Sequence, residues 1–170
     1  MKLKDLDKML ESVLDDTEKL GIETGKITGI AIKSGDYSFC ARCCKRERFY
    51  SNTTVQEEFS IEVCESVLNI PEKSLKTIIA HEVLHTCKGC FGHTKKWNIY
   101  AKRMNDFMGY KIQRTTGNLD MSGYTPSFSY ILECNTCGNT IGRRKRSSII
   151  DHPERYKCPR CHCASLVLVS

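Results

Sequence analysis

The sequence predicts an α+β fold, with helices and a few strands in the first part of the chain and a small cysteine-rich module at its end. Three observations predict it. Residues 2–20 place leucine and valine at helical spacing, residues 26–33 alternate like a half-buried strand, and two Cys-x-x-Cys pairs lie between residues 134 and 161. A chain of 170 residues can hold one moderate hydrophobic core plus a module held together by a metal, but not two ordinary cores.

The first helix and the strands after it are predicted from periodicity. Residues 2–20 mix acidic and basic side chains on the polar face, which favours packing against a core over binding a membrane surface, and Gly21 stands where the helix would stop. Strands are expected over 26–33 (KITGIAIK) and 36–50 (DYSFCARCCKRERFY), with a Ser-Gly-Asp turn between them. Residues 57–70 (EEFSIEVCESVLNI) favour a strand followed by a short helix.

Two longer helices are expected next. One begins near Pro71 and runs through SLKTIIAHEVLHT until two glycines end it, and the other starts after His93 and stops at Gly109. Residues 114–128 are rich in turn formers. We therefore expect a core domain over residues 1–113, a linker over 114–128 and the cysteine-rich module over 129–170.

Composition argues against a membrane or secreted protein. No apolar run approaches the roughly 20 residues that a membrane helix needs, and the charged start MKLKDLDKMLESVLDD is unlike a secretory signal, so we expect a cytoplasmic protein. Eleven cysteines in a reducing compartment indicate metal ligation rather than disulfides. Nearly all of the formal net charge of +6 lies in residues 134–170, which contain seven Lys and Arg residues and only two acidic residues.

The stretch HEVLH carries two histidines four residues apart. On a helix, His81 and His85 project from the same face and can hold one metal ion. Zinc favours such neutral nitrogen ligands and needs a third protein ligand, with a fourth position left for water. His93 is the favoured third ligand, because the glycines before it let the chain reverse toward the same metal. Asp106 on the next helix is the alternative, in a thermolysin-like arrangement.

Glu82 follows the first of these histidines and is not needed as a metal ligand. Zinc lowers the pKa of a bound water toward about 7, and Glu82 can accept that proton and later deliver it to the leaving amine. The pattern therefore predicts a hydrolytic zinc centre. A closed, structural histidine site is the alternative.

The C-terminal module carries two Cys-x-x-Cys pairs separated by twenty residues. This spacing is the signature of a zinc ribbon, in which two tight turns present four thiolates tetrahedrally. A segment this small buries too little apolar surface to fold alone, so the metal would supply much of its folding free energy. The expected ligands are Cys134, Cys137, Cys158 and Cys161.

Other positions leave alternatives open. Gly138 follows the first pair, where a residue tolerant of positive φ is wanted, but His162 stands at the matching place after the second pair. His162 or Cys163 could therefore replace a cysteine ligand. Elsewhere, a second four-cysteine site competes with free, buried thiols. The residues concerned are Cys40, Cys43, Cys87 and Cys90.

The ordered combination of motifs resembles the SprT-like zinc metalloprotease family, which includes the DNA-repair protease Spartan. The motifs are His81-Glu82-Val83-Leu84-His85, Gly92-His93 with Trp97 four residues later, Arg114, and the four-cysteine ribbon. The resemblance implies a compact protease core, with helices on a short mixed sheet and the HExxH helix against that sheet, followed by the ribbon. It also implies a catalytic zinc on His81, His85 and His93 with Glu82 as base, and a structural zinc on the ribbon cysteines. Thr94 departs from the glycine that relatives commonly carry after the third histidine.

A zinc endopeptidase acting on protein substrates, DNA-associated or crosslinked to DNA, is therefore expected, as a monomer without a membrane partner. Eukaryotic relatives cleave proteins trapped on DNA, and nucleic acid helps to localise and activate them. A basic run in the ribbon could place cations on the phosphates of single-stranded or damaged DNA, with an aromatic ring on unpaired bases. The candidate contacts are Arg143, Arg144, Lys145, Arg146 and Tyr156. A non-catalytic, zinc-stabilised nucleic-acid-binding protein is the alternative.

Overall fold

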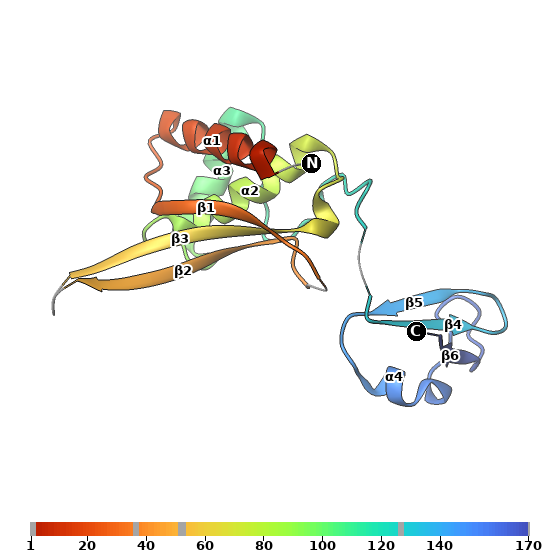
Figure 1. Ribbon diagram of the computed structural model, residues 1–170. Helices are drawn as coiled ribbons and strands as arrows, with labels where there is room; N and C mark the ends of the chain where they lie inside the picture. The colour runs from red at the N-terminus through yellow and green to blue at the C-terminus, as the bar shows by residue number, and fades with distance from the viewer. Residues whose placement is uncertain (1–2, 36–37, 51–53, 126–127, 170) are drawn as a thin grey trace. The chain divides into compact units, whose positions relative to one another are not determined.

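The computed structural model describes residues 3–35, 38–50, 54–125 and 128–169, and it confirms a mixed α+β fold (Figure 1). The first part contains helices α1 (Leu3–Lys19), α2 (Glu72–Thr86) and α3 (Lys95–Met108). Its strands are β1 (Lys26–Lys33), β2 (Ala41–Tyr50) and β3 (Thr54–Cys64), and the 3-10 turn η2 (Glu65–Val67) follows β3. The last part holds β4 (Tyr130–Cys134), β5 (Thr140–Arg143), α4 (Ser148–Asp151), η3 (Pro153–Arg155) and β6 (Leu166–Leu168). Within these described ranges, no helix has both the length and the apolar character that crossing a bilayer requires.

The chain divides into two compact units. The first comprises residues 1–34 and 39–125, and the second comprises residues 35–38 and 126–170. The change of unit after Thr125 falls inside the stretch 114–128 that the sequence marks as a linker. Residues 114–125 belong to the first unit because Leu119, Met121 and Tyr124 pack against its hydrophobic core.

The sheet of the first unit is mixed, in the strand order β1-β3-β2. β1 runs parallel to β3, with a register shift between Ile27 and Ile30, and β2 runs antiparallel to β3. The central strand β3 carries the most buried positions of the sheet, since Ile61 and Val63 are fully buried. β2 is an edge strand, and Cys43 on it lies opposite Ile61.

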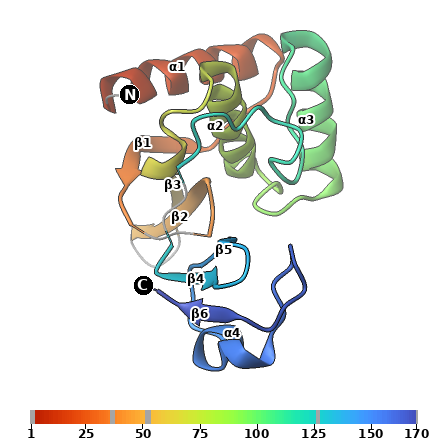
Figure 2. The same ribbon diagram turned by 90° about the vertical axis from the view of Figure 1, so that its right-hand side faces the viewer.

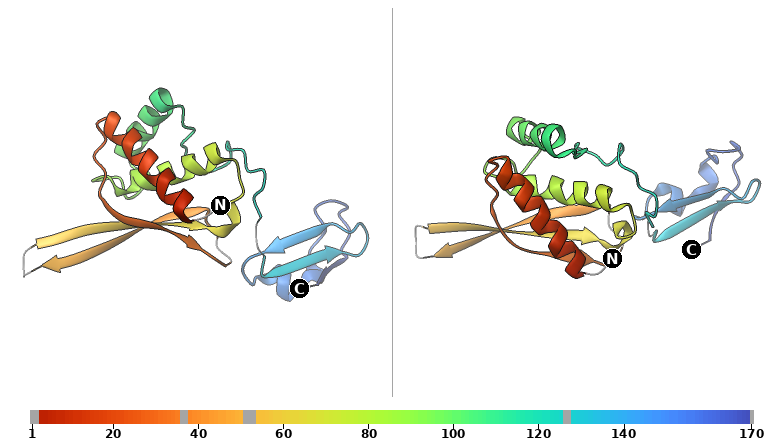
Figure 3. Two further views of the ribbon diagram at one scale, coloured as in Figure 1. Left: turned by 45° about the horizontal axis from the view of Figure 1, so that its top comes forward. Right: turned by 90° about the horizontal axis from the view of Figure 1, so that it is seen from above.

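The three helices of the first unit lie on one face of this sheet (Figure 1 and Figure 3). α2 contacts β2 and β3 as well as α1 and α3, so it lies at the centre of the unit (Figure 2). Apolar side chains such as Leu75 and Ile79 are fully buried along it, and polar side chains, among them Thr77 and Glu82, are buried as well. Buried polar groups on a helix need partners, which marks α2 as the element to search for a functional site.

Two strands differ in extent from the sequence prediction. β2 begins at Ala41 rather than at residue 36, and residues 36 and 37 lie outside the described residues. β3 begins at Thr54, ahead of the predicted start at residue 57, because residues 54–57 pair with β2 in a long antiparallel hairpin. The short helix expected after this strand is the single turn η2.

The second unit is built on a small antiparallel sheet of order β5-β4-β6. In the sequence, α4 and η3 lie between β5 and β6. Few of its apolar side chains are buried; they are Leu132, Ile150 and Leu166, next to the buried cysteines Cys134 and Cys158. So small a core gives little stability, and a bound metal is the usual way in which such a unit is stabilised.

Candidate metal centres

His81, Glu82 and His85 lie in the second half of α2. The one-turn separation of the two histidines puts their rings on the same side of the helix, with ring centroids 4.9 Å apart. His85 and Glu82 are each only 8% exposed, because α2 is covered by its neighbours on most sides. The helix therefore presents two imidazoles and one carboxyl group, and the His85 ring and the carboxyl group are shielded from solvent.

His93 approaches the same place from the loop between α2 and α3. Gly89 turns that loop with a φ of 80°, a left-handed conformation that favours glycine. Thr94 then caps α3, since its hydroxyl accepts from the backbone N–H of Trp97 at 3.2 Å and donates to the Gly89 carbonyl at 2.9 Å. Thr94 thus fixes the backbone next to His93.

The three imidazoles meet at their Nε2 atoms. Nε2 of His81 lies 3.2 Å from that of His85 and 3.0 Å from that of His93. Two nitrogens bound to one tetrahedral zinc at about 2.0–2.1 Å would lie about 3.3 Å apart. The group has the dimensions of a zinc site. Asp106, the alternative third ligand, is not part of it and pairs with Lys102 instead.

Hydrogen bonds at the other ring nitrogen fix the tautomers of two rings. Nδ1 of His81 lies 2.9 Å from the Gln113 carbonyl oxygen, and Nδ1 of His85 lies 2.9 Å from the Cys90 carbonyl oxygen. A carbonyl only accepts, so each Nδ1 carries a proton and each neutral ring has a lone pair at Nε2. Two such lone pairs 3.2 Å apart repel each other unless a cation lies between them.

The cation between the rings is not expected to be a proton, because the pKa values of all three histidines are lowered. Burial, together with the charges of His85 and His93, lowers the pKa of His81 to about 4. Burial also lowers the pKa of His85, and burial together with the charge of Arg114 lowers the pKa of His93. At neutral pH the three rings are therefore neutral, which is the form in which imidazole binds a metal ion.

Glu82 is held toward the edge strand of the sheet, where the backbone N–H of Cys43 donates a hydrogen bond to its carboxylate. Burial raises the pKa of Glu82 to about 7, against the lowering effect of that hydrogen bond. A carboxyl group with this pKa exchanges a proton near neutral pH, and a cation bound beside it would lower the value.

Trp97 packs against all three imidazoles. Its ring centroid lies 4.8 Å from that of His81, 5.5 Å from that of His85 and 4.6 Å from that of His93. The side chain is 1% exposed, and within the described residues its indole N–H has no hydrogen-bond acceptor. The single tryptophan of the chain thus contacts every ring of the histidine group.

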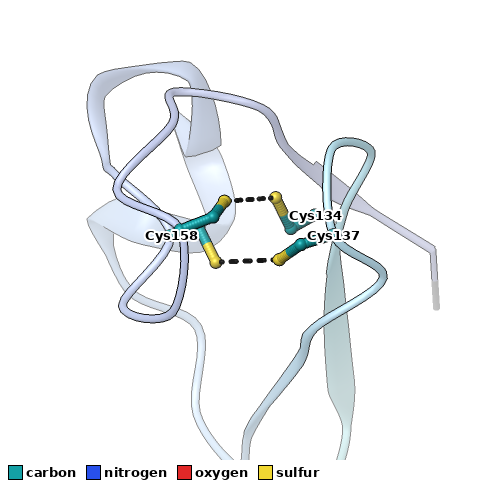
Figure 4. A group of neighbouring side chains, drawn as sticks. Cys134, Cys137 and Cys158 are labelled. Atoms are coloured by element: carbon teal, nitrogen blue, oxygen red, sulfur yellow. Dashed lines mark hydrogen bonds between the residues drawn. The ribbon is translucent and has the colours of Figure 1, made fainter.

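The second unit brings the four predicted cysteines together, and the sulfur atoms of Cys134, Cys137 and Cys158, which Figure 4 labels, are turned toward the centre of the group. Sγ of Cys134 lies 3.6 Å from Sγ of Cys161, and Sγ of Cys137 lies 3.7 Å from Sγ of Cys158. Two thiolates on one tetrahedral zinc at about 2.3 Å would lie about 3.8 Å apart. The four sulfurs form a group that can hold a metal ion and are compatible with a zinc ribbon.

The two cysteine turns share one backbone geometry. Gly138 and His162 adopt left-handed φ angles of 66° and 59°. The N–H of Gly138 donates to the Cys134 carbonyl, and the N–H of His162 donates to the Cys158 carbonyl, each at 2.8 Å. His162 therefore completes a turn as Gly138 does, and neither His162 nor Cys163 belongs to the group of four.

Backbone N–H donors also favour the thiolate form of Cys134. Burial disfavours the Cys134 thiolate, but the backbone N–H groups of Cys137 and Thr136, together with hydrogen bonds from the Cys161 and Cys137 thiols, outweigh it and lower the pKa of the Cys134 thiol to about 6. A thiolate, rather than a thiol, is the form that binds a metal. The backbone of this turn therefore stabilises the thiolate that would bind a metal ion.

The remaining cysteine pairs do not form another site. In the part of the chain that the structure describes, only the histidine and cysteine groups above bring three or more ligand atoms together, so Cys40, Cys43, Cys87 and Cys90 make no third group. Burial raises the pKa of the Cys43 thiol and that of the Cys87 thiol to about 12. These two side chains are protonated thiols at neutral pH.

Two of the predicted nucleic-acid contacts are engaged inside the second unit. Arg146 forms an ion pair with Asp151, with Nε 2.6 Å from the carboxylate oxygen. The hydroxyl of Tyr156 lies 2.5 Å from that of Ser148. The first contact offsets part of the Arg146 charge, and the second occupies the Tyr156 hydroxyl.

An aromatic side chain that sequence reasoning passed over lies beside the basic run. The ring of Phe128 packs over Gly142, where an added Cβ would come within 2.3 Å of it, and the Arg144 guanidinium lies 5.7 Å from its centroid. Phe128 is 42% exposed, so part of its side chain is accessible to solvent. The signal in the sequence is the absence of a side chain at Gly142, which no motif marks.

Sequence reasoning also missed the groups that support the histidines and Glu82. They are the carbonyl of Gln113, the N–H of Cys43 and the guanidinium of Arg114, which donates to the His93 carbonyl at 3.1 Å. The first two are backbone groups, to which residue type gives no guide. Arg114 contributes to the family resemblance, but its contact is visible only in the structure.

Comparison with models of known families, with curated proteins and with solved structures gave no match. What the chain does is therefore inferred from the chemistry of its two groups of metal ligands.

Proposed function

We propose that this chain is a zinc-dependent endopeptidase of the SprT-like kind, which hydrolyses peptide bonds in protein substrates. The observation that carries the proposal is the convergence of three neutral imidazoles at their Nε2 atoms, with the buried carboxyl group of Glu82 on the helix that carries two of them. His81, His85 and His93 would hold the zinc ion, and Glu82 would be the base. Three protein ligands leave a fourth position for water or substrate, which distinguishes a catalytic zinc from a structural one.

Zinc, when bound, polarises a substrate carbonyl and lowers the pKa of a coordinated water. Glu82 accepts a proton from the attacking water at a carboxylate oxygen and then donates it to the nitrogen of the leaving amine. The Cys43 N–H holds the carboxylate in place through both transfers. The pKa of about 7 that burial gives Glu82, reduced by a nearby cation, makes both protonation states accessible at neutral pH.

The Cys134, Cys137, Cys158 and Cys161 group would hold a structural zinc, since four thiolates leave no position for a reacting molecule. We further propose that the second unit binds DNA and so directs the peptidase to DNA-associated or crosslinked proteins. Arg143, Arg144 and Lys145, together with the exposed ring of Phe128, supply cations for phosphates and a surface for unpaired bases.

The test is a cleavage assay on a DNA-bound protein substrate, with and without single-stranded DNA. Glu82→Gln should lower the rate by at least about 10²–10⁴-fold while zinc content and folding stay unchanged, because it removes only the proton acceptor. Glu72→Gln, an exposed carboxyl group in the first turn of the same helix, is the matched control and should cleave normally.

Two results would contradict the proposal. One is cleavage by Glu82→Gln at the wild-type rate. The other is a wild-type chain that carries zinc at the histidines, binds DNA and cleaves nothing, which would favour a non-catalytic zinc-stabilised nucleic-acid-binding protein.

A further inference from the structure

The segment from Gly109 to Arg114 follows α3 and contains no helix or strand. We call residues 109–114 the strap. It contacts two of the three histidines, because the Gln113 carbonyl accepts from Nδ1 of His81 and the Arg114 guanidinium donates to the carbonyl of His93. His81 belongs to α2 and His93 to the loop before α3. The strap therefore links ligands that come from two separate elements.

Asn105 on α3 fastens the strap close to these contacts. Its side-chain oxygen accepts from the Ile112 N–H at 2.7 Å, and its NH₂ group donates to the Ile112 carbonyl at 2.9 Å. This pair of hydrogen bonds replaces the partner that a neighbouring strand would provide. Ile112 is 3% exposed, so its backbone has little water available in place of Asn105.

The other end of the strap is held independently. Gly109 ends α3 with a left-handed φ of 70°, and Tyr110 follows with 7% exposure. The Tyr110 hydroxyl donates to the carboxylate of Asp16 on α1 at 2.7 Å. This contact stabilises the same segment, but it touches neither Ile112 nor a histidine.

We propose that Asn105 is a positioning residue for the histidine centre. By fixing Ile112 it places the next carbonyl, that of Gln113, which holds the His81 ring with its Nε2 lone pair toward His85 and His93. Groups that bond the second nitrogen of a metal-binding histidine typically account for about 10–100-fold in metal affinity. The inference rests on the metal site of the proposed function, but not on peptide hydrolysis.

The experiment measures Co²⁺ binding to the chain of residues 1–170 by quenching of the fluorescence of Trp97, the only tryptophan in the chain and a neighbour of all three imidazoles. Asn105→Ala should weaken Co²⁺ binding at the histidines by up to about 10-fold, the lower end of this range, because Asn105 acts through the Gln113 carbonyl. Asn105→Asp keeps the acceptor for the Ile112 N–H and loses the donor, so its affinity should fall between those of wild type and Asn105→Ala. Tyr110→Phe should lose stability but keep wild-type affinity.

The absorption spectrum of Co²⁺ separates the two sites, because thiolate ligands give intense charge-transfer bands and histidines give only weak d–d bands. The thiolate bands should be the same in all four proteins, and the d–d bands should change in the Asn105 variants. Wild-type Co²⁺ affinity in Asn105→Asp and Asn105→Ala would overturn the inference, as would equal weakening in Tyr110→Phe. Should Asn105→Ala not fold, Asn105→Asp still decides the matter. A wild-type chain that binds no metal at the histidines would instead refute the proposed function, and this inference with it.

Discussion

The Nε2 atoms of His81 and His93 lie 3.0 Å apart, although twelve positions separate the two residues in the sequence. His81 donates through Nδ1 to the Gln113 carbonyl, so the nitrogen that faces His93 carries a lone pair. Helix geometry alone does not bring these atoms together. The glycine turn at Gly89 and the cap at Thr94 do so, and the close approach becomes favourable when both nitrogens bind one cation.

Zinc content should distinguish His93 from Asp106 as the third ligand. The two ligand groups predict two zinc ions per chain, and His93→Ala should reduce the number to one because two imidazoles bind zinc weakly. Asp106→Ala should keep both ions, since Asp106 pairs with Lys102 outside the histidine group. Elemental analysis of the purified proteins gives the answer, and circular dichroism checks the fold. The reverse pattern would identify the carboxylate as the ligand.

Trp97 should matter for its shape rather than for its indole N–H. Trp97→Ala opens a cavity behind the three imidazoles and should cost about 3–5 kcal/mol of unfolding free energy, together with a weaker metal site. Trp97→Phe keeps a ring there and removes a buried donor that has no acceptor within the described residues. Relief of that desolvation, worth about 1–3 kcal/mol, should offset much of the smaller cavity.

Denaturant unfolding followed by circular dichroism would measure both variants. Phe107→Ala on the same helix is a control, because its side chain is 73% exposed and its removal leaves no cavity. An equal loss of stability in Trp97→Phe and Trp97→Ala would mean that the indole N–H has a partner of its own.

The parts of the structure that follow from local spacing could be predicted from the sequence. His81 and His85 are four residues apart, so any helix brings them to the same face, and the two Cys-x-x-Cys turns form through their own backbone hydrogen bonds. The α+β class follows from the same kind of periodicity. Such features are local, so a pattern over a few residues contains them.

What the sequence could not predict depends on contacts between distant segments. The strap combines exposed Gln113 with buried Ile112 and has no period of its own, and its partner Asn105 looks like any polar residue on a helix. The Cys43 N–H reaches Glu82 only because the β2–β3 pairing places Cys43 on the edge next to α2. Hydrogen bonds to the backbone leave no mark in residue type, which is why these supporting groups were missed.

Stability should fall in acid through Asp16. Burial raises the pKa of this carboxyl group, but hydrogen bonds from Tyr110 and Lys76 and the charges of Lys76 and Lys19 outweigh burial and hold its pKa below the usual 3.8. A lowered folded-state pKa means that the contribution is complete above the unfolded-state value of about 3.9 and is lost as pH falls through the folded-state value. Asp16→Asn should therefore cost about 1.5–3 kcal/mol at pH 7 and less at pH 3.

The measurement is denaturant unfolding of the first unit at both pH values, followed by Trp97 fluorescence. Asp15→Asn, a change at the exposed neighbouring position on α1, should have little effect at either pH. A cost of Asp16→Asn that stays the same between pH 7 and pH 3 would show that shape, and not charge, explains the effect.

Salt dependence should separate the basic residues of the second unit. Each cation that contacts a phosphate of single-stranded DNA contributes about 0.7 to the slope of log affinity against log salt concentration. Arg144→Gln should reduce that slope by about this amount, because the guanidinium lies beside the exposed ring of Phe128. Arg146→Gln should leave the slope nearly unchanged, since Arg146 is paired with Asp151 at 2.6 Å. Fluorescence anisotropy of a labelled oligonucleotide over a range of salt measures both, and a larger change for Arg146→Gln would contradict this assignment of the contacts.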